Sequence, residues 1–317
     1  RHKHCVSPTE ASDAFAQHAN FARTDKALLH SYDLSYGPFL APYIDKRVSL
    51  LEIGTQNGES LELWRRLFAN TSMIAGVSYL ARNAPSISYD AMYHGSQANV
   101  TFLREIEADL QGRRFNIIID DGSHVPSHQL STLAFVFDRL LIEGGMYIIE
   151  DLETSYWDKK GGATIYEHYR IRAGIGTRGS AVEKLKQMVD VLNRYYLADP
   201  HYAVLPGAVD HQVASVTFSR NCAILHKKVR ARWDQVDRAD SPALRAKYPG
   251  GAAAYRPWAL DPKRTLYNKY REANSWDMTT HPHASIRVEW CRGRRTGVEK
   301  PLLPLMPLLL LRARRRR

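Results

Sequence analysis

Cysteine is scarce in this sequence, and apolar runs of membrane-spanning length are absent. The 317 residues include three cysteines, and none of them stands in a Cys-x-x-Cys pair. This excludes a disulfide framework and gives no support to a cysteine-based zinc or redox site. The apolar run at residues 301–311 holds three prolines and is 11 residues long, whereas a membrane-spanning helix needs about 20. We therefore expect no transmembrane segment.

Positive charge is in excess, with a formal net charge of +11, but much of it is terminal. Five of the last six residues, 312–317, are arginines. Such a run can dock on phosphates or on anionic lipid, although it is more commonly a solvated chain end. We therefore predict no specific nucleic-acid partner.

The sequence begins at Arg1 and not at a methionine, so a targeting segment can lie outside it. The compartment is therefore open, with the cytoplasm as the default expectation. The oligomeric state is open as well, and a homo-oligomer is compatible with this sequence.

Apolar runs alternate with amphipathic stretches from Val48 onward, which is typical of an α/β domain with a parallel sheet. The hydrophobic content of 44% suits a full core. The expected strands lie near 48–53, 73–77, 115–120 and 145–150, the expected helices near 59–68, 99–110, 127–141 and 181–197, and an antiparallel hairpin near 212–219 and 222–227.

Four carboxylates and a histidine follow two of these strand-like runs. Asp120, Asp121 and His124 come after the first run, and Glu150 and Asp151 come after the second. The carboxyl ends of parallel strands border the ligand crevice of an open sheet, so these side chains can converge there. Clustered carboxylates repel unless a cation or a proton joins them, and Mg²⁺ prefers oxygen ligands. The pattern therefore predicts a metal site of Asp121, Glu150 and Asp151, with His124 as a base of near-neutral pKa.

A structural interpretation of the same residues stays open. Asp-Gly-Ser is a common turn sequence, and the aspartates could cap a helix that begins near Pro126. This alternative is strongest for Asp120. His128 is a lesser candidate for the base, and we expect it on the surface.

A glycine-bearing turn lies upstream, where an apolar run ends in Glu52, Gly54, Gln56 and Gly58 and a helical pattern follows. Glycine tolerates positive φ and lets a ligand approach the backbone, so nucleotide-like cofactors lie over such turns. Ordinary strand-to-helix turns also use glycine, so the turn alone does not decide for a cofactor.

Together these segments resemble the class I S-adenosylmethionine-dependent methyltransferases, specifically the metal-dependent sugar O-methyltransferases typified by the macrocin and mycinamicin enzymes. Cephalosporin-hydroxylase-like proteins share much of the pattern. The resemblance rests on Thr24-Asp25-Lys26, the aromatic set His30, Tyr32 and Tyr36, and the segments 51–54, 120–124, 151–157 and 215–225. It implies a Rossmann-like, seven-stranded, mostly parallel sheet, S-adenosylmethionine and Mg²⁺ as cofactors, and a small-molecule acceptor that contains a sugar.

The resemblance also implies cofactor contacts. The residues that it assigns to S-adenosylmethionine are Glu52, Gly54, Gln56, Gly58, Ser78, Gln97 and Asp120. Two positions depart from the family pattern, since Ser78 and Ser96 stand where acidic residues are expected. Losing a charge-assisted hydrogen bond to the ribose costs about 1.5–3 kcal/mol. The alternative function is therefore a non-catalytic binding protein with a degenerate cofactor site.

The expected organisation has three parts. Residues 1–47 form an N-terminal helical cap, residues 48–230 the Rossmann-like methyltransferase domain, and residues 231–317 a partly disordered extension with a basic tail. We expect residues 158–179, rich in glycine and charge, to form a loop that faces the acceptor.

Overall fold

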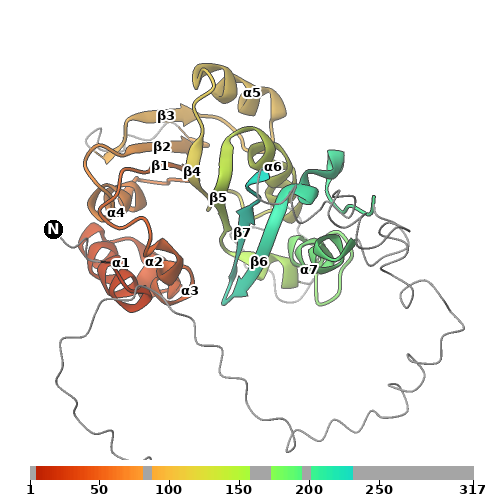
Figure 1. The fold of residues 1–317 in the computed structure, drawn as a ribbon, viewed down its shortest axis with the longest axis horizontal. Coiled ribbons are helices and arrows are strands. Elements are labelled where there is room, and N and C mark those ends of the chain that lie inside the picture. The colour runs from red at the N-terminus through yellow and green to blue at the C-terminus, as the bar shows by residue number, and fades with distance from the viewer. Residues whose placement is uncertain (1–4, 81–87, 158–172, 195–200, 231–317) are drawn as a thin grey trace, which may run out of the picture. The chain divides into compact units, whose positions relative to one another are not determined.

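The structure, a computed structural model, describes residues 5–80, 88–157, 173–194 and 201–230. Within them, seven strands form one sheet in the order β3-β2-β1-β4-β5-β7-β6 (Figure 1). The first five strands in that order are parallel, and β7 and β6 close the sheet as an antiparallel hairpin. The predicted seven-stranded, mostly parallel sheet is therefore confirmed.

The strands are β1 Ser49–Ile53, β2 Met73–Ser78, β3 Ala91–His94, β4 Phe115–Asp120, β5 Leu141–Ile149, β6 Val213–Ser219 and β7 Cys222–Lys227. The α-helices are α1 Pro8–Ala22, α2 Asp25–Leu28, α3 Tyr32–Ser35, α4 Glu59–Leu67, α5 Val100–Asp109, α6 Pro126–Arg139 and α7 Ala181–Leu192. Short 3₁₀-helices lie at Gly37–Leu40, Leu152–Tyr156 and Pro206–Gln212.

Three details differ from the sequence-based expectation. Strand β3 had no predicted range, because it is four residues long and none of its side chains is fully buried. Helix α6 ends at Arg139 and not at 141, because Leu141 already pairs with Phe115 at the start of β5. Helix α7 ends at Leu192 and not near 197.

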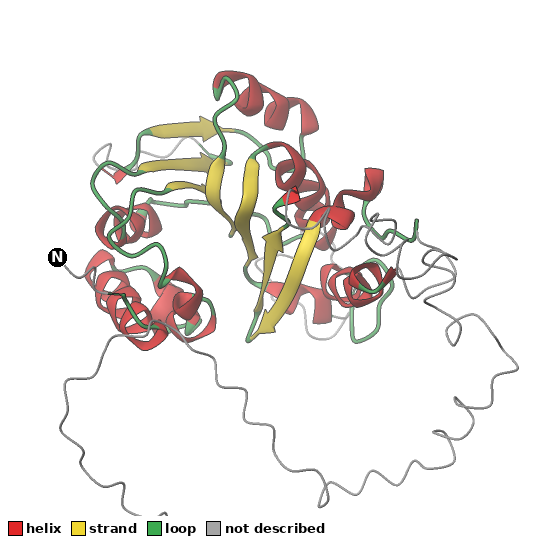
Figure 2. Cartoon of the chain, viewed as in Figure 1, coloured by secondary structure: helices red, strands yellow, loops and turns green. Residues whose placement is uncertain are grey.

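Helices cover both faces of the sheet (Figure 2), which is why its strands are apolar on both faces. Alternate residues of β1 belong to different cores. Leu50 packs in the same cluster as Trp64 of α4, whereas Leu51 packs with Leu133 of α6. The central strands are therefore fixed from both sides, and their carboxyl ends are held at one edge.

The N-terminal helices attach to the sheet through aromatic side chains. Ser7 and Glu10 form a capping box at the start of α1. Phe15 of the same helix makes edge contacts with Tyr36 and Trp64, with ring centroids 5.4 and 5.6 Å apart. This packing carries α2 and α3 to the carboxyl ends of the strands.

Several predictions made from the sequence lie outside the described residues or are not tested by them. The extension 231–317 and residues 158–172 of the acceptor loop are outside, and the boundary between the parts 1–47 and 48–230 stays a prediction. In the described part of the chain, no helix has the length and apolar character that crossing a membrane requires.

A buried lysine ties β7 to the end of α6. Lys227 Nζ donates hydrogen bonds to the carbonyl oxygens of Phe137, Asp138 and Leu141 at 2.6, 2.9 and 3.0 Å. These carbonyls lie at or just beyond the helix C-terminus, where a cation is favourable. Burial, together with the charge of Arg114, lowers the pKa of Lys227 to about 8.

Replacing this lysine should destabilise the fold. We expect Lys227→Met to lower the free energy of unfolding by about 1–3 kcal/mol at pH 7, because it leaves buried carbonyls without donors. Urea denaturation measures the change, with Lys186→Met on the exposed side of α7 as a control that should stay within about 0.5 kcal/mol.

The pH dependence has a defined sign. The pKa of Lys227 is lower in the folded chain than in the unfolded chain, so above pH 8 the unfolded chain holds more protons. Wild type should therefore gain stability relative to Lys227→Met between pH 7 and 9. A difference that does not change with pH would contradict the lowered pKa.

The turn after β1 leaves no room for a side chain at Gly54. A Cβ built there would lie 1.8 Å from the carbonyl oxygen of Asp121, and the residue has a φ of +94°. Gly179 has a similar φ of +88°, but a Cβ there would meet no atom within 4 Å. The two glycines thus share a positive φ, which would strain any residue with a Cβ, and differ in steric contact.

This pair allows a controlled test of how closely the ends of β1 and β4 approach. We expect Gly179→Ala to cost about 1 kcal/mol of folding free energy through its left-handed backbone. Gly54→Ala should cost about 1–3 kcal/mol more, because the two strand ends must separate. Equal losses in denaturant titrations would argue against the close approach.

Candidate functional site

The register of the sheet brings polar side chains from three strand ends together. Asp120 pairs with Ile53 of β1 on one side and with Ile149 of β5 on the other. The amide of Asp121 donates to the carbonyl of Ile53 at 2.8 Å, and the amide of Glu150 donates to the carbonyl of Asp120 at 2.9 Å. Asp121 and Glu150 therefore begin their loops at the same level of the sheet.

A buried lysine lies among these carboxylates. Lys26 of α2 is 1% exposed, and its Nζ lies 2.6 Å from Asp121 Oδ2, 2.7 Å from Glu150 Oε2 and 3.2 Å from Glu52 Oε1. Burial alone would lower the pKa of Lys26, but the three carboxylates raise it well above its ordinary value. The lysine is therefore a fixed positive charge.

Lys26 was not predicted as a site residue. Its nearest carboxylates lie 95 and 124 positions further along the chain, and no local pattern encodes such contacts. The resemblance at Thr24-Asp25-Lys26 was the one sign in the sequence that this segment matters.

Glu150, a predicted metal ligand, uses both carboxylate oxygens within the protein. Oε2 accepts from Lys26, and Oε1 accepts a hydrogen bond from the Tyr36 hydroxyl at 2.7 Å. Burial raises the pKa of Glu150. Its role as a metal ligand stays a prediction, and its side chain lies in the inner part of the cluster.

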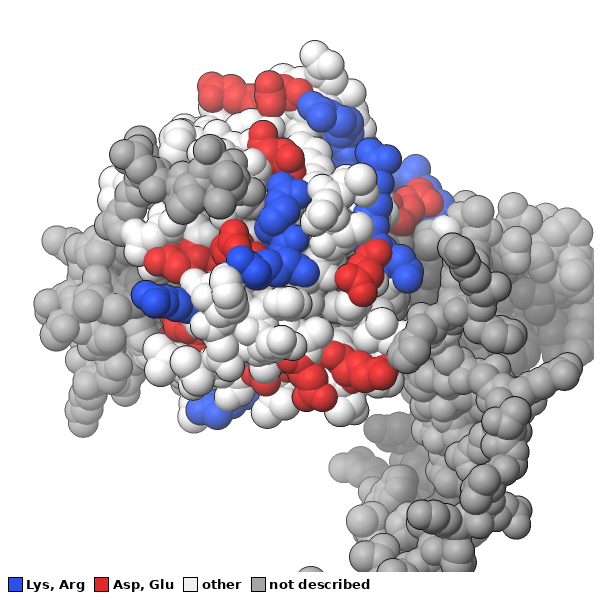
Figure 3. Space-filling model, turned by 90° about the vertical axis from the view of Figure 1, so that its left-hand side faces the viewer, with Lys and Arg blue, Asp and Glu red and all other residues white. Residues whose placement is uncertain are grey.

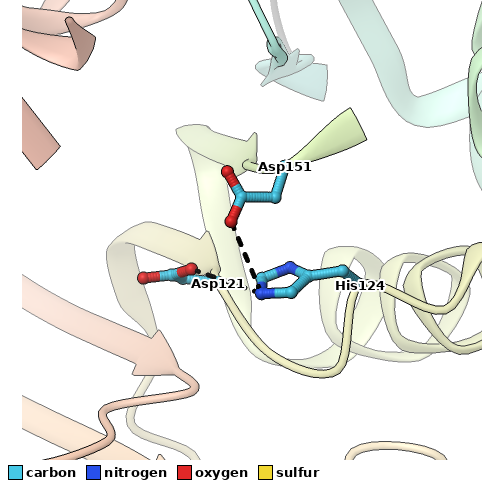
Figure 4. A group of neighbouring side chains, drawn as sticks. All are labelled: Asp121, His124 and Asp151. Atoms are coloured by element: carbon cyan, nitrogen blue, oxygen red, sulfur yellow. Dashed lines mark ion pairs between the residues drawn. The ribbon is translucent and has the colours of Figure 1, made fainter. Parts of the chain in front are cut away.

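Asp121, His124 and Asp151 form the outer part of the cluster (Figure 4). His124 Nε2 lies 3.5 Å from Asp151 Oδ2 and 3.9 Å from Asp121 Oδ1. One atom from each side chain can be chosen so that all three lie within 4.8 Å of one another. Carboxylate oxygens suit Mg²⁺, and an imidazole nitrogen is also accepted by Mn²⁺, so the set fits a divalent cation.

The second oxygens of both aspartates are held by other residues. Asp121 Oδ2 faces Lys26, while Asp151 Oδ1 accepts from the Tyr32 hydroxyl at 2.6 Å and from Asn221 Nδ2 at 3.1 Å. Tyr32 belongs to the aromatic set of the resemblance, but Asn221, in the β6–β7 turn, was not predicted. These contacts fix which oxygen each aspartate presents to His124.

Strained backbone accompanies the outer cluster. His124 and Asp151 have φ values of +56° and +51°, in the left-handed region that residues other than glycine rarely occupy. The hydroxyl of Thr154 donates to the carbonyl oxygen of His124 at 2.6 Å and steadies this loop. His128, the lesser candidate, is oriented by a 2.9 Å contact between its Nδ1 and Ser123 Oγ.

A cavity of about 560 Å³ lies at the carboxyl ends of β1, β2 and β4. Four of the predicted cofactor residues line it, namely Gly54, Gln56, Ser78 and Gln97. The Ser78 hydroxyl donates to the carbonyl oxygen of Leu80 at 2.6 Å, so it is turned toward its own loop.

The other three predicted cofactor residues do not line this cavity. Gly58 precedes α4 with a left-handed φ of 91°. Glu52 is fully buried, and its Oε2 accepts from Ser60 Oγ and from Trp64 Nε1 at 2.5 and 3.1 Å. The sequence located Glu52 at the turn but not the direction of its side chain.

Asp120 is likewise turned into the protein. Its two oxygens accept from Gln97 Nε2 at 2.9 Å and from the Tyr147 hydroxyl at 2.8 Å. Burial raises the pKa of Asp120 to about 6. Gln97 in turn accepts from the amide of Ser123 at 2.6 Å, so Asp120 supports the cavity wall indirectly.

A second cavity, of about 480 Å³, adjoins the first. The residues that line both cavities are Gly54, Thr55, Gln56, Asp121 and His124. The second cavity is otherwise walled by polar and charged side chains that include Arg23, His30, Glu153 and Trp157. The Asp121–His124 pair therefore lies where two ligands could meet.

No family model matches the sequence. Curated proteins do match it, including the 8-demethyl-8-α-L-rhamnosyl tetracenomycin-C 2'-O-methyltransferase of Streptomyces olivaceus, which is 31% identical over 223 residues, or 68% of this chain and 55% of that protein. The mycinamicin VI 2''-O-methyltransferase of Micromonospora griseorubida is 28% identical over 210 residues, or 63% of this chain and 48% of that protein. The chain thus spans about half the length of the curated relatives that it matches.

Solved structures agree with these matches. The MycE methyltransferase of mycinamycin biosynthesis, in a complex with Mg and SAH, superposes with a TM-score of 0.56 at 26% identity, covering 68% of this chain and 53% of that one. In sequence and in fold, this chain is therefore related to the class I S-adenosylmethionine-dependent methyltransferases of the macrocin and mycinamicin sugar O-methyltransferase group.

Proposed function

We propose that this chain is an S-adenosylmethionine- and Mg²⁺-dependent O-methyltransferase that acts on a hydroxyl of a sugar or of a glycosylated small molecule. The observation that carries the proposal is the junction of two cavities at Asp121 and His124. A transferase for two small molecules needs a donor pocket and an acceptor pocket that share the reacting groups.

The first cavity, of about 560 Å³, suits the methyl donor. Its residues Gly54, Gln56, Ser78 and Gln97 lie at the carboxyl ends of the strands, where cofactors bind in doubly wound sheets. When bound, S-adenosylmethionine supplies a methyl group on a sulfonium, and Mg²⁺ supplies a Lewis acid for the acceptor oxygen.

Asp121 and Asp151 are the carboxylates that we assign to Mg²⁺. Each has one oxygen fixed by a protein donor and the other directed toward His124. Glu150 is the third carboxylate of the sequence prediction. In this assignment it does not bind the ion, because its two oxygens accept hydrogen bonds from Lys26 and Tyr36. Most coordination positions are left to water and acceptor oxygens, as Mg²⁺ prefers.

His124 is the residue that we assign to proton transfer. With S-adenosylmethionine bound, the acceptor oxygen would take the methyl group as its bond to sulfur breaks, and His124 Nε2 would accept the hydroxyl proton. The products are a methyl ether and S-adenosylhomocysteine. Asp151, 3.5 Å from the same nitrogen, stabilises the imidazolium that results.

A small acceptor suits the charge distribution better than a nucleic acid does. On the face drawn in Figure 3, acidic side chains lie beside and between the basic ones. We assign the second cavity, of about 480 Å³, to the acceptor and call it the acceptor cavity. Its residues Arg23, Glu153 and Trp157 offer donors, acceptors and an aromatic face, which suits a hydroxyl-rich ring. The cytoplasm as the default compartment and a homo-oligomer as a possible state stay predictions from the sequence.

Binding and transfer test the proposal directly. We expect calorimetric titration to detect S-adenosylhomocysteine binding to wild type, and expect labelled S-adenosylmethionine to yield a labelled product from a glycoside panel. The label should disappear with EDTA and return with Mg²⁺, and Asp121→Ala should abolish the metal-dependent rate. Transfer that persists in EDTA would contradict the metal role, and absent cofactor binding in folded protein would favour the non-catalytic alternative.

His124→Ala separates proton transfer from metal binding. We expect the rate to fall by about 10²- to 10⁴-fold, the usual contribution of a general base, with S-adenosylhomocysteine and Mn²⁺ still bound. His18→Ala, on α1 and outside both cavities, is the control and should retain most of the rate. If His124→Ala loses Mn²⁺ binding as well, His124 is a metal ligand and not the base.

A further inference from the structure

A single side chain divides the carboxylate cluster into an inner and an outer part. We propose that the Lys26 ammonium fills a second cation position of this cluster, so that the site takes one divalent ion and not two. The proposal rests on the proposed function, because it assigns that ion to the outer part, Asp121 and Asp151. Lys26 is then a positioning residue, not a catalytic one.

The inner part consists of Lys26 and the carboxylate oxygens of Glu52, Glu150 and Asp121 that lie around it. It has the geometry of a cation site with the ammonium nitrogen at its centre. Lys26 Nζ has three carboxylate oxygens within 3.2 Å, and they come from β1, from the loop after β4 and from the loop after β5. The distances of 2.6 and 2.7 Å to Asp121 and Glu150 are those of charge-assisted hydrogen bonds. The ammonium is 1% exposed, so it does not exchange these partners for water.

Asp121 connects the two parts. Its Oδ2 faces Lys26, and its Oδ1 faces His124 and the outer cluster. A carboxylate shared between two cation positions in this way is the arrangement that two-metal sites use. Here a covalently attached ammonium stands where the second ion would be.

Charge makes the ammonium necessary. Glu52, Asp120, Asp121, Glu150 and Asp151 gather five carboxylates at one edge of the sheet, and one divalent ion offsets only two negative charges. Lys26 offsets a third negative charge, in the part of the cluster that is furthest from solvent. Without it, the inner carboxylates would need protons or a second ion to remain together.

The N-terminal helices also gain a defined position. Lys26 is part of α2, and its neighbours Thr24 and Asp25 line the acceptor cavity. The contact that neutralises the carboxylates therefore also fixes a wall of that cavity against them.

Counting bound ions tests the inference without any assay of methyl transfer. Mn²⁺ titration followed by electron paramagnetic resonance gives the number of ions per chain for wild type, Lys26→Met and Lys227→Met. We expect one ion in wild type and two in Lys26→Met. Lys227→Met makes the same chemical change in another buried lysine whose partners are neutral carbonyls, so it should gain none.

Thermal unfolding adds a second readout. Mn²⁺ should raise the melting temperature of Lys26→Met more than that of wild type or Lys227→Met, because an ion bound only by the folded chain stabilises it. A folded Lys26→Met with no additional ion would overturn the inference, and so would a second ion in wild type. If wild type binds no Mn²⁺, the metal role in the proposed function fails, while the difference between variant and wild type still decides for or against Lys26.

A variant that keeps the lysine covers the case in which Lys26→Met does not fold. Glu150→Gln preserves shape and leaves Asp121 and Asp151 intact, so Mn²⁺ should bind it more tightly than it binds Asp151→Asn. The reverse order would make Glu150 a ligand of the ion and would remove the separation between the two parts.

Discussion

The site depends on the neutralisation of the carboxylates that gather at the carboxyl edge of the sheet, namely Glu52, Asp120, Asp121, Glu150 and Asp151. The buried ion pairs of Lys26 with Glu52, Asp121 and Glu150 contribute to this neutralisation in the interior. Removing one partner from a buried pair commonly costs about 3–5 kcal/mol, since the remaining charge is left without compensation. The N-terminal helices are therefore coupled to the sheet by charge as well as by the aromatic packing around Phe15.

The position of the site follows from the order of the strands. Chain connections run from β1 outward through β2 to β3, and then return to the other side of β1 for β4 and β5. Such a reversal opens a crevice at the carboxyl ends of the two strands where it occurs. Gly54 after β1 and Asp121 after β4 border that crevice and belong to both cavities. The fold thus places the two cavities side by side.

Much of this architecture could be predicted from the sequence, because buried parallel strands are continuous apolar runs and the acidic residues directly follow two of them. β3 was missed because a short, partly exposed strand has no such run. The directions of Glu52 and Asp120 were missed because a pattern locates a residue at a strand end without showing whether its side chain faces the cavity or the core. Lys26 and Asn221 were missed because their partners lie far away along the chain.

The left-handed backbone at His124 and Asp151 has a consequence for how this protein can change. Each such residue costs about 1–3 kcal/mol, and glycine would relieve that cost at either position. Glycine would also delete the imidazole or the carboxylate to which the proposed function assigns proton transfer and metal binding. Selection for stability and selection for the proposed activity therefore favour different residues at positions 124 and 151. Substitutions that raise the melting temperature without loss of that activity are expected at other positions.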